Sequence, residues 1–203
     1  QYNLGGAMTD YARAIELNPK NPLFYLNRSR AHLFLQEFDS TIADCNRSID
    51  LDYNKEEVYL IRGMAYREIE FFDESLEDFN RAIRRNPDNT YNYVQRGLLY
   101  MDRDEPDKAI DDFNRAIVMN SNNSFALFHR GLARIETSDT LGAYDDLNRV
   151  IELAPRNSHA YYNRAILRLG EHDEDGALED LDRVISLNPD NIIVYLYRGK
   201  IKY

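Results

Sequence analysis

The sequence predicts an all-α protein, a solenoid in which pairs of antiparallel helices follow one another along the chain. Three observations predict this fold. A six-residue block that begins with Asp returns at a fixed interval of 34 residues, and a row of Arg residues has the same interval. Between these marks, apolar residues recur at helical spacing and do not alternate with the period of two that is typical of β-strands. A fixed period of this size indicates stacked supersecondary units.

The first row is a repeated block of sequence. Residues 78–83 have the sequence Asp-Phe-Asn-Arg-Ala-Ile, and residues 112–117 are identical to them. Similar but not identical blocks occur in the other repeats. The Asp that opens each block stands 34 residues after the last one, without any insertion: Asp10, Asp44, Asp78, Asp112, Asp146 and Asp180. Every repeat is therefore expected to contain the same elements.

The second row consists of Arg residues with fixed neighbours. A small residue follows each Arg, and an aromatic residue or Leu stands three residues before it. The members of this row are again 34 residues apart: Arg28, Arg62, Arg96, Arg130, Arg164 and Arg198. Because two different segments recur in each period, each repeat is expected to contain two helices.

Residues 90–123 show how the elements of one repeat are read. Residues 90–101 are rich in apolar side chains and predict a first helix, and 102–107 form a polar turn that contains Pro106. Residues 109–117 carry apolar side chains at i, i+1, i+4, i+7 and i+8, which predicts a second helix. Prolines that stand just past the second helix end it in four repeats: Pro19, Pro87, Pro155 and Pro189.

These markers together resemble the tetratricopeptide repeat family over essentially the whole chain. The small residues after the Arg row match the family's Gly/Ala site, Ala109 matches its small residue early in the second helix, and Phe79 and Phe113 match its aromatic residue. The chain departs from the family in having Tyr for the usual Trp and Arg for the Leu before the Gly. The resemblance implies a right-handed superhelical α-solenoid whose first helices line a concave face.

The register divides residues 1–203 into a single array of repeats. The full repeats are 22–55, 56–89, 90–123, 124–157 and 158–191; residues 1–21 are a second helix without its partner, and 192–203 are a first helix without its partner. A terminal helix is normally polar on its outer face, and residues 192–203 have little polar surface. We therefore expect the natural N-terminus to precede Gln1 and more repeats to follow Tyr203.

Composition excludes several classes of function. The chain has 43% hydrophobic and 30% charged residues, which is typical of a globular protein. Its net charge of −10 repels phosphate backbones, so nucleic acid is not expected as a partner. No stretch approaches the roughly 18 apolar residues of a membrane span, so we expect no direct membrane insertion. The single cysteine, Cys45, slightly favours a reducing compartment such as the cytoplasm.

No motif indicates catalysis, a metal or a cofactor. The four histidines lack the spacing of a metal site, and neither a Gly-rich phosphate loop nor a Ser nucleophile elbow is present. Cys45 stands where other repeats have Phe, Leu or Tyr, so we interpret it as a residue that fills the core. The sequence therefore predicts a protein that is not an enzyme.

The Arg and Asp rows predict a structural ladder. The resemblance places the Arg midway along the first helix and the Asp near the middle of the second, so each Arg can meet an Asp of its own or the adjacent repeat. A ligand site rarely needs a copy in every repeat, whereas a half-buried ion pair would fix the register of the helices. The ladder residues are Arg28, Arg62, Arg96, Arg130, Arg164, Asp44, Asp78, Asp112, Asp146 and Asp180.

The resemblance also places mostly apolar side chains on the concave face. Exposed apolar patches mark binding sites, and apolar grooves receive helices through residues at helical spacing. The expected groove consists of Tyr91, Val94, Leu98, Met101, Phe125, Phe128, Leu132, Ile135 and Tyr162. If the register is shifted, these residues pack inside the array instead.

The sequence thus predicts a scaffold that binds another protein, through a peptide or an amphipathic helix. Two alternatives stay open. The array can be the non-catalytic targeting or assembly arm of a larger enzyme or envelope complex, or it can be a structural module that self-associates through its exposed ends.

Overall fold

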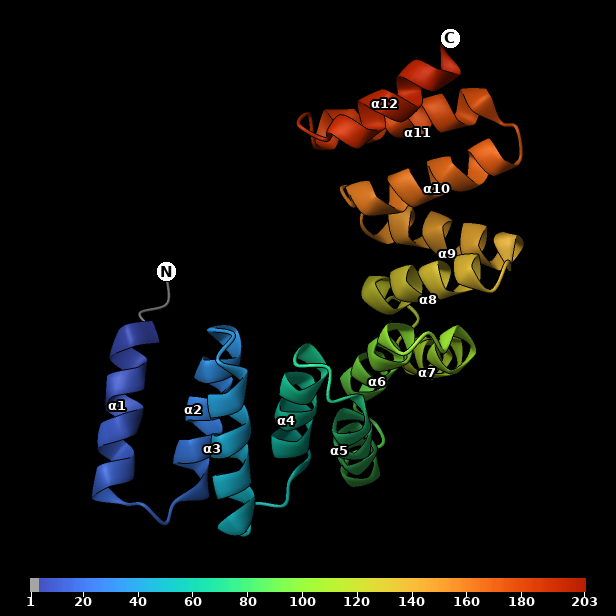
Figure 1. Ribbon diagram of the computed structural model, residues 1–203. Coiled ribbons are helices and arrows are strands. Elements are labelled where there is room, and N and C mark those ends of the chain that lie inside the picture. The colour runs from blue at the N-terminus through green and yellow to red at the C-terminus, as the bar shows by residue number, and fades with distance from the viewer. Residues whose placement is uncertain (1–3) are drawn as a thin grey trace. The chain divides into compact units, whose positions relative to one another are not determined.

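The computed structural model describes residues 4–203, and within them the chain forms twelve α-helices and no strand (Figure 1). In order, the helices are α1 Leu4–Leu17, α2 Pro22–Phe34, α3 Phe38–Asp50, α4 Glu56–Glu68, α5 Phe72–Arg85, α6 Thr90–Asp102, α7 Pro106–Met119, α8 Ser124–Glu136, α9 Thr140–Leu153, α10 Ser158–Gly170, α11 Glu174–Leu187 and α12 Ile192–Ile201. The all-α class and the tandem helix pairs predicted from the sequence are confirmed.

The chain forms two compact units. The N-terminal unit ends at Arg103 and contains α1–α6, whereas the C-terminal unit begins at Asp104 and contains α7–α12. The boundary falls inside the repeat 90–123, in the turn between its two helices. The single array over residues 1–203 stays a prediction.

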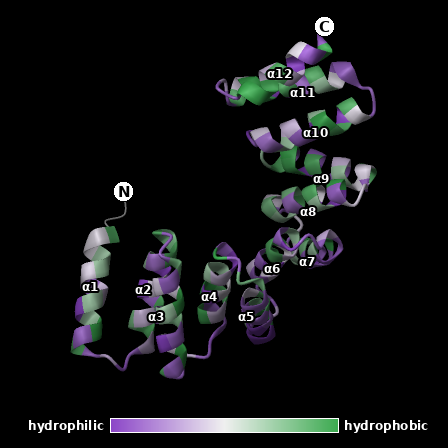
Figure 2. Ribbon diagram, viewed as in Figure 1, coloured by the Kyte–Doolittle hydropathy of each residue, from purple (hydrophilic) through white to green (hydrophobic). Residues whose placement is uncertain are grey.

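The same pairing of helices recurs in both units. The two helices of one repeat pack against each other, as α2 does with α3 and α10 with α11. Each second helix also packs against the next first helix, as α3 does with α4 and α9 with α10. In the N-terminal unit, the successive first helices α2, α4 and α6 touch as well. Helices such as α3, α4 and α9 are therefore covered from more than one direction. Hydrophobic and hydrophilic residues are mixed along each helix (Figure 2).

Both helices of a repeat contribute to the core, the first helices through residues such as Leu26 and Leu99, and the second helices through small residues and larger side chains. In α5, Ser75, Phe79 and Ala82 are fully buried, and their spacing of four and three residues places them on one side of the helix. Cys45 occupies the position of Phe79 in α3 and is also fully buried. Burial raises the pKa of its thiol to about 12, so the thiol stays neutral and unreactive near pH 7.

One residue with a positive φ ends the first helix of each repeat. The φ angles at these positions lie between 58° and 63°, and the residues are 34 apart: Gln36, Glu70, Asp104, Ser138 and His172. The next backbone N–H then bonds the carbonyl five residues back, as in Glu37 N to His32 O at 2.9 Å. This is the Schellman end of a helix. The same short turn in every repeat explains why the period holds without an insertion.

Candidate functional site

Arg–Asp pairs join the two helices of a repeat in the N-terminal unit. Arg28 donates from Nε and Nη2 to the two carboxylate oxygens of Asp44 at 2.7 and 2.6 Å. Arg62 donates in the same way to Asp78 at 2.7 and 2.8 Å. Both Asp residues are buried. Paired charge-assisted bonds of this kind are strong and fix the orientation of both side chains.

The C-terminal unit contains the same pairs. Arg130 donates to Asp146 at 2.9 and 2.5 Å, and Arg164 donates to Asp180 at 2.8 and 2.6 Å. In each case the partner is the Asp sixteen residues later, within the same repeat. Arg96 belongs to the N-terminal unit and Asp112, which is buried, to the C-terminal unit.

Five Arg residues of the row also reach back to the preceding repeat through Nη1: Arg62, Arg96, Arg130, Arg164 and Arg198. Arg164 donates to Asn148 at 2.7 Å, and Arg96 donates to Asn80 at 2.5 Å. The guanidinium of Arg164 therefore links the three helices α9, α10 and α11. The hydrogen bond to Asp180 raises the pKa of Arg164, against the opposing effect of burial. Since these charged groups are occupied by one another, the pairs act as structural ties and offer little to a ligand.

Ion pairs cross the surface of the first helices in the N-terminal unit. Arg30 of α2 binds Glu57 of α4 at 2.8 Å, and Arg67 of α4 binds Asp102 of α6 at 2.9 Å. Beside them lies a cavity of about 380 Å³ between α2, α4 and α6, which Arg67 helps to line. Ion pairs between successive first helices therefore hold this surface together.

The expected groove residues of α6 differ in exposure. Tyr91 is exposed, and Leu98 and Met101 are half-buried. Val94 is only 2% exposed, so its place in the groove is corrected to a place in the core. Val94 and the equivalent residue of α2, Leu26, fit between the neighbouring helices, where Leu26 belongs to a core cluster. The larger rings at the same position of α8 and α10, Phe128 and Tyr162, are only half-buried.

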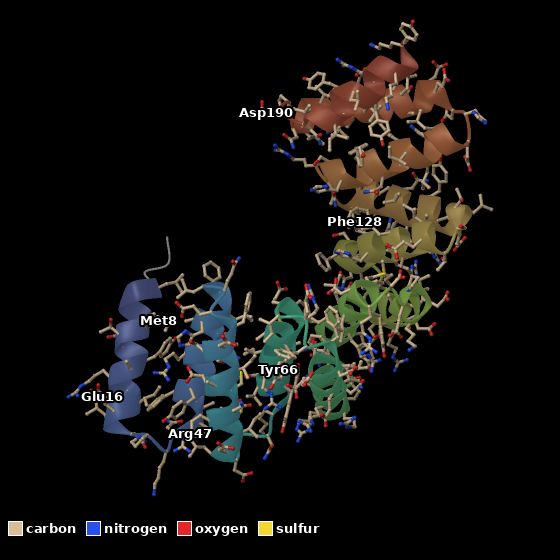
Figure 3. All side chains as sticks on the ribbon, in the orientation of Figure 1. Met8, Glu16, Arg47, Tyr66, Phe128 and Asp190 are labelled. Carbon is tan, nitrogen blue, oxygen red and sulfur yellow. The ribbon has the colours of Figure 1, made fainter. Side chains whose placement is uncertain are left out.

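Aromatic rings cover the surface of the first helices in the C-terminal unit. Phe125 is 50% exposed, and Phe128, labelled on α8 in Figure 3, is half-buried. The centroid of the His129 ring lies 4.3 Å from that of Phe125 and 5.3 Å from that of Phe128. The ring centroids of Phe128 and His159 are 6.5 Å apart. Leu132 and Ile135 of α8 are half-buried.

The ring contacts continue from α10 to α12. Tyr162 meets Tyr197 edge to face at 6.1 Å. Burial, together with the neighbouring Tyr197, raises the pKa of Tyr162, so its hydroxyl is neutral near pH 7. We call the set of these rings the aromatic surface: Phe125, Phe128, His129, His159, Tyr162 and Tyr197.

The first-helix surfaces of both units carry side chains suited to non-covalent contact with another molecule. Among residues 4–203, no group of three or more His, Cys, Asp or Glu side chains is placed to hold a metal ion. The helices of the same range include none that combines the length and the apolar character needed to cross a bilayer. The aromatic surface can bury apolar side chains of a partner and stack against its rings.

The comparisons with known proteins agree with this geometry. A sequence model described as tetratricopeptide repeat matches residues 62–124. The solved structure of YrrB, described as a TPR protein with an unusual peptide-binding site, superimposes with a TM-score of 0.74 at 24% identity, covering 94% of this chain and 97% of that one. Residues 62–124 thus match the tetratricopeptide repeat family, and the described chain has the fold of a tetratricopeptide repeat array.

Other solved structures share this fold. MamA matches with a TM-score of 0.65 at 25% identity over 68% of this chain and 81% of its own. Yeast Tom70 matches with a TM-score of 0.77 at 18% identity, over 96% of this chain and 42% of its own. At the lower identities the likeness shows the fold alone. A search among curated proteins found no significant sequence match.

Three members of the aromatic surface lie outside the expected groove: His129, His159 and Tyr197. His129 and Tyr197 both follow an apolar residue of the first-helix face, and they are separated by two repeat periods. They therefore occupy one row, whose other members are not rings: Asn27, Ile61, Gln95 and Asn163. Reading every row of the repeat for aromatic side chains, and not only the apolar face, would have found them.

Proposed function

We propose that this protein is a non-catalytic scaffold of the tetratricopeptide repeat type, whose aromatic surface binds an apolar peptide or an amphipathic helix of another protein. The observation that carries the proposal is the half-exposed ring of Phe125 beside Phe128 and His129 on one first helix. Large aromatic side chains are enriched among the residues that dominate binding energy. The description of YrrB as a peptide-binding TPR protein supports the same class of function.

The spacing of the rings suits a helical ligand. Phe125 and Phe128 are three residues apart, so they share one side of α8. Leu132 and Ile135 continue that side, and Tyr162 extends the surface onto α10. An amphipathic helix presents apolar residues at matching intervals. The net charge of −10 favours a partner that carries Lys or Arg beside its apolar residues.

The N-terminal unit offers a second, smaller surface. Tyr91 is exposed on α6, with Leu98 and Met101 half-buried on the same helix. We propose these three residues as a contact for the same partner or for another segment of it. The Arg67–Asp102 ion pair belongs to the same first-helix surface, so a ligand there meets charged as well as apolar side chains.

The proposal is tested by replacing the two Phe rings. We expect Phe128→Ala to weaken partner binding by more than about 1 kcal/mol while helical content is kept, because its ring is partly exposed. The Phe125→Ala/Phe128→Ala double variant should lose partners that the wild-type chain retains in affinity purification with mass spectrometry. Binding titration and a thermal melt on the same variants separate lost affinity from lost stability.

Two controls make the result specific. Leu141→Ala removes an exposed apolar side chain from the second helix α9 and should keep every partner. Leu147→Ala removes a fully buried side chain and should cost about 2–5 kcal/mol of stability. The proposal fails if Phe128→Ala destabilises the chain as much as Leu147→Ala does, or if the double variant retains the partners of the wild type.

Two other functions remain proposals. The chain can serve as the targeting or assembly arm of a larger enzyme or envelope complex, in which case the partners found above would be subunits of that complex. It can also self-associate as a structural module, which light scattering across a concentration series would detect.

A further inference from the structure

Two adjoining cavities lie at the ends of the first helices in the N-terminal unit. The cavity of about 380 Å³ between α2, α4 and α6 has five apolar side chains in its wall: Leu33, Phe34, Phe38, Met64 and Leu98. A second cavity of about 350 Å³ adjoins it, because Arg67 and Glu68 line both. The wall of this second cavity is mostly charged: Arg67, Glu68, Glu70, Phe72 and Asp102. We call the two cavities together the mixed groove, with an apolar part and an acidic part.

The acidic part holds more negative charge than the chain itself neutralises. Nε of Arg67 lies 2.9 Å from Asp102, and Nη2 of Arg67 lies 3.4 Å from Glu68. Glu70 adds a third carboxylate, so three carboxylates line the cavity together with one guanidinium. Burial raises the pKa of Asp102, against the opposing effect of Arg67. A second cation in the cavity would favour the charged carboxylates and offset the effect of burial.

The helix ends at this place also favour a cation. Glu68 is the last residue of α4, and Asp102 is the last residue of α6. The C-terminus of a helix carries partial negative charge, so it stabilises a cation and disfavours a carboxylate. The repeat does not require acidic residues here, because Gly170 and His172 stand at the positions of Glu68 and Glu70 in the turn after α10. Carboxylates that are unfavourable for their own helices therefore line a groove that attracts positive charge.

We propose that the mixed groove binds a Lys or Arg side chain of a partner protein, together with an apolar residue of the same segment. Lys and Arg have an apolar stem and a charged head. The stem lies on Met64 and Leu98 in the apolar part, and the head reaches Glu68 and Glu70 in the acidic part. The neighbouring apolar residue packs beside Phe38. This inference rests on the proposed scaffold function, but it concerns the N-terminal unit and not the aromatic surface.

The test begins with a selection of peptides on the full chain. The probe is a phage-displayed library of random peptides of about 12 residues, the length of a short linear segment. We expect the selected peptides to be enriched in Lys or Arg next to an apolar residue. The affinity of a selected basic peptide, made synthetically with a fluorescent label, is then measured by fluorescence anisotropy. Glu70→Lys should weaken its binding by at least about tenfold, because the variant places a like charge where the head of the ligand lies.

Two further variants make the result specific. Asp52→Lys is the matched control, because Asp52 is also an exposed acidic turn residue with a positive φ, 67° against 63° at Glu70. It should bind the peptide as the wild type does, since Asp52 precedes α4 and lies outside the groove. Met64→Lys places a cation of the chain itself in the groove and should weaken binding by at least about tenfold. Its fold should be kept, because Arg30 occupies the same position of α2, and far-UV circular dichroism checks this.

The outcomes separate this inference from the proposed function. Peptides that Glu70→Lys loses and that Phe125→Ala/Phe128→Ala retains would support the mixed groove. Basic peptides that Glu70→Lys retains and the double Phe variant loses would bind the aromatic surface, which would support the proposed function and overturn this inference. A selection without enrichment of Lys or Arg would overturn it too, as would equal losses in Glu70→Lys and Asp52→Lys.

Discussion

The two compact units carry the same ladder beneath different first-helix surfaces. In the N-terminal unit, ion pairs such as Arg30–Glu57 join successive first helices. In the C-terminal unit, ring contacts such as Phe128–His159 do so. Beneath both surfaces, a buried Asp holds the Arg of the first helix of its repeat, as in Asp78 and Asp146. The Arg and the Asp of the ladder are the same in every repeat, whereas the surface of the first helices differs between the units and is free to carry specificity.

Removing a rung of the shared ladder has the largest expected effect. Asp146 is 2% exposed and accepts hydrogen bonds from both Arg130 and Arg134. Asp146→Ala leaves the guanidinium of Arg130 without its carboxylate and removes one of the two carboxylates that Arg134 contacts, the other being Asp139. We expect a loss of about 3–5 kcal/mol in the free energy of unfolding. Urea denaturation followed by circular dichroism measures this loss.

The neighbouring residue supplies the control for the ladder. Asp145 precedes Asp146 on α9 but is exposed, so Asp145→Ala should change stability by no more than about 0.5 kcal/mol. Equal denaturation midpoints for Asp146→Ala and Asp145→Ala would show that the pair does not hold the helices together, and the common interior of the two units would need another explanation.

The close approach of the helices differs between the units, and this predicts opposite signs for one substitution. At Gly63 a Cβ would lie 2.9 Å from the Phe79 ring, whereas at Gly131 the nearest atom is at 3.4 Å, an ordinary contact. We expect Gly63→Ala to destabilise the chain by about 1–3 kcal/mol through overpacking. Gly131→Ala should stabilise it by up to about 1 kcal/mol, because Ala favours a helix more than Gly does.

The same denaturation series tests both Gly variants side by side. Phe79 stands where the C-terminal unit has Leu147, and the larger ring is the reason for the tighter approach. If both substitutions destabilise by similar amounts, the two interfaces are packed alike, and the difference between the units is confined to the surface.

The fold was predictable because the period repeats the same helix-forming pattern with fixed turns. The period alone did not decide whether an Arg meets the Asp of its own or of the adjacent repeat, since both choices recur every 34 residues. The structure shows the pairs within one repeat. The burial of Val94 could not be predicted from the sequence, because an apolar residue suits both a groove and a core. The rotation of the helix about its axis decides between the two. Ring contacts such as Tyr162–Tyr197 depend on the distance between neighbouring first helices, and this distance cannot be read from a pattern of residues.

The smallest expected effect belongs to the ionic surface of the N-terminal unit. Arg30 and Glu57 are 48% and 49% exposed, so water screens their attraction. We expect a double-mutant cycle with Arg30→Gln and Glu57→Gln to give a coupling energy of about 0.2–1 kcal/mol. At about 1 M NaCl, where charges are screened beyond about 3 Å, the coupling should fall toward zero. The loss caused by Asp146→Ala should persist in the same salt, because that carboxylate is buried.

A coupling of Arg30 with Glu57 that stays above about 2 kcal/mol in high salt would exceed the range of exposed pairs. The ionic surface would then hold the first helices as firmly as the ladder does, and it would not be free to vary as the aromatic surface is.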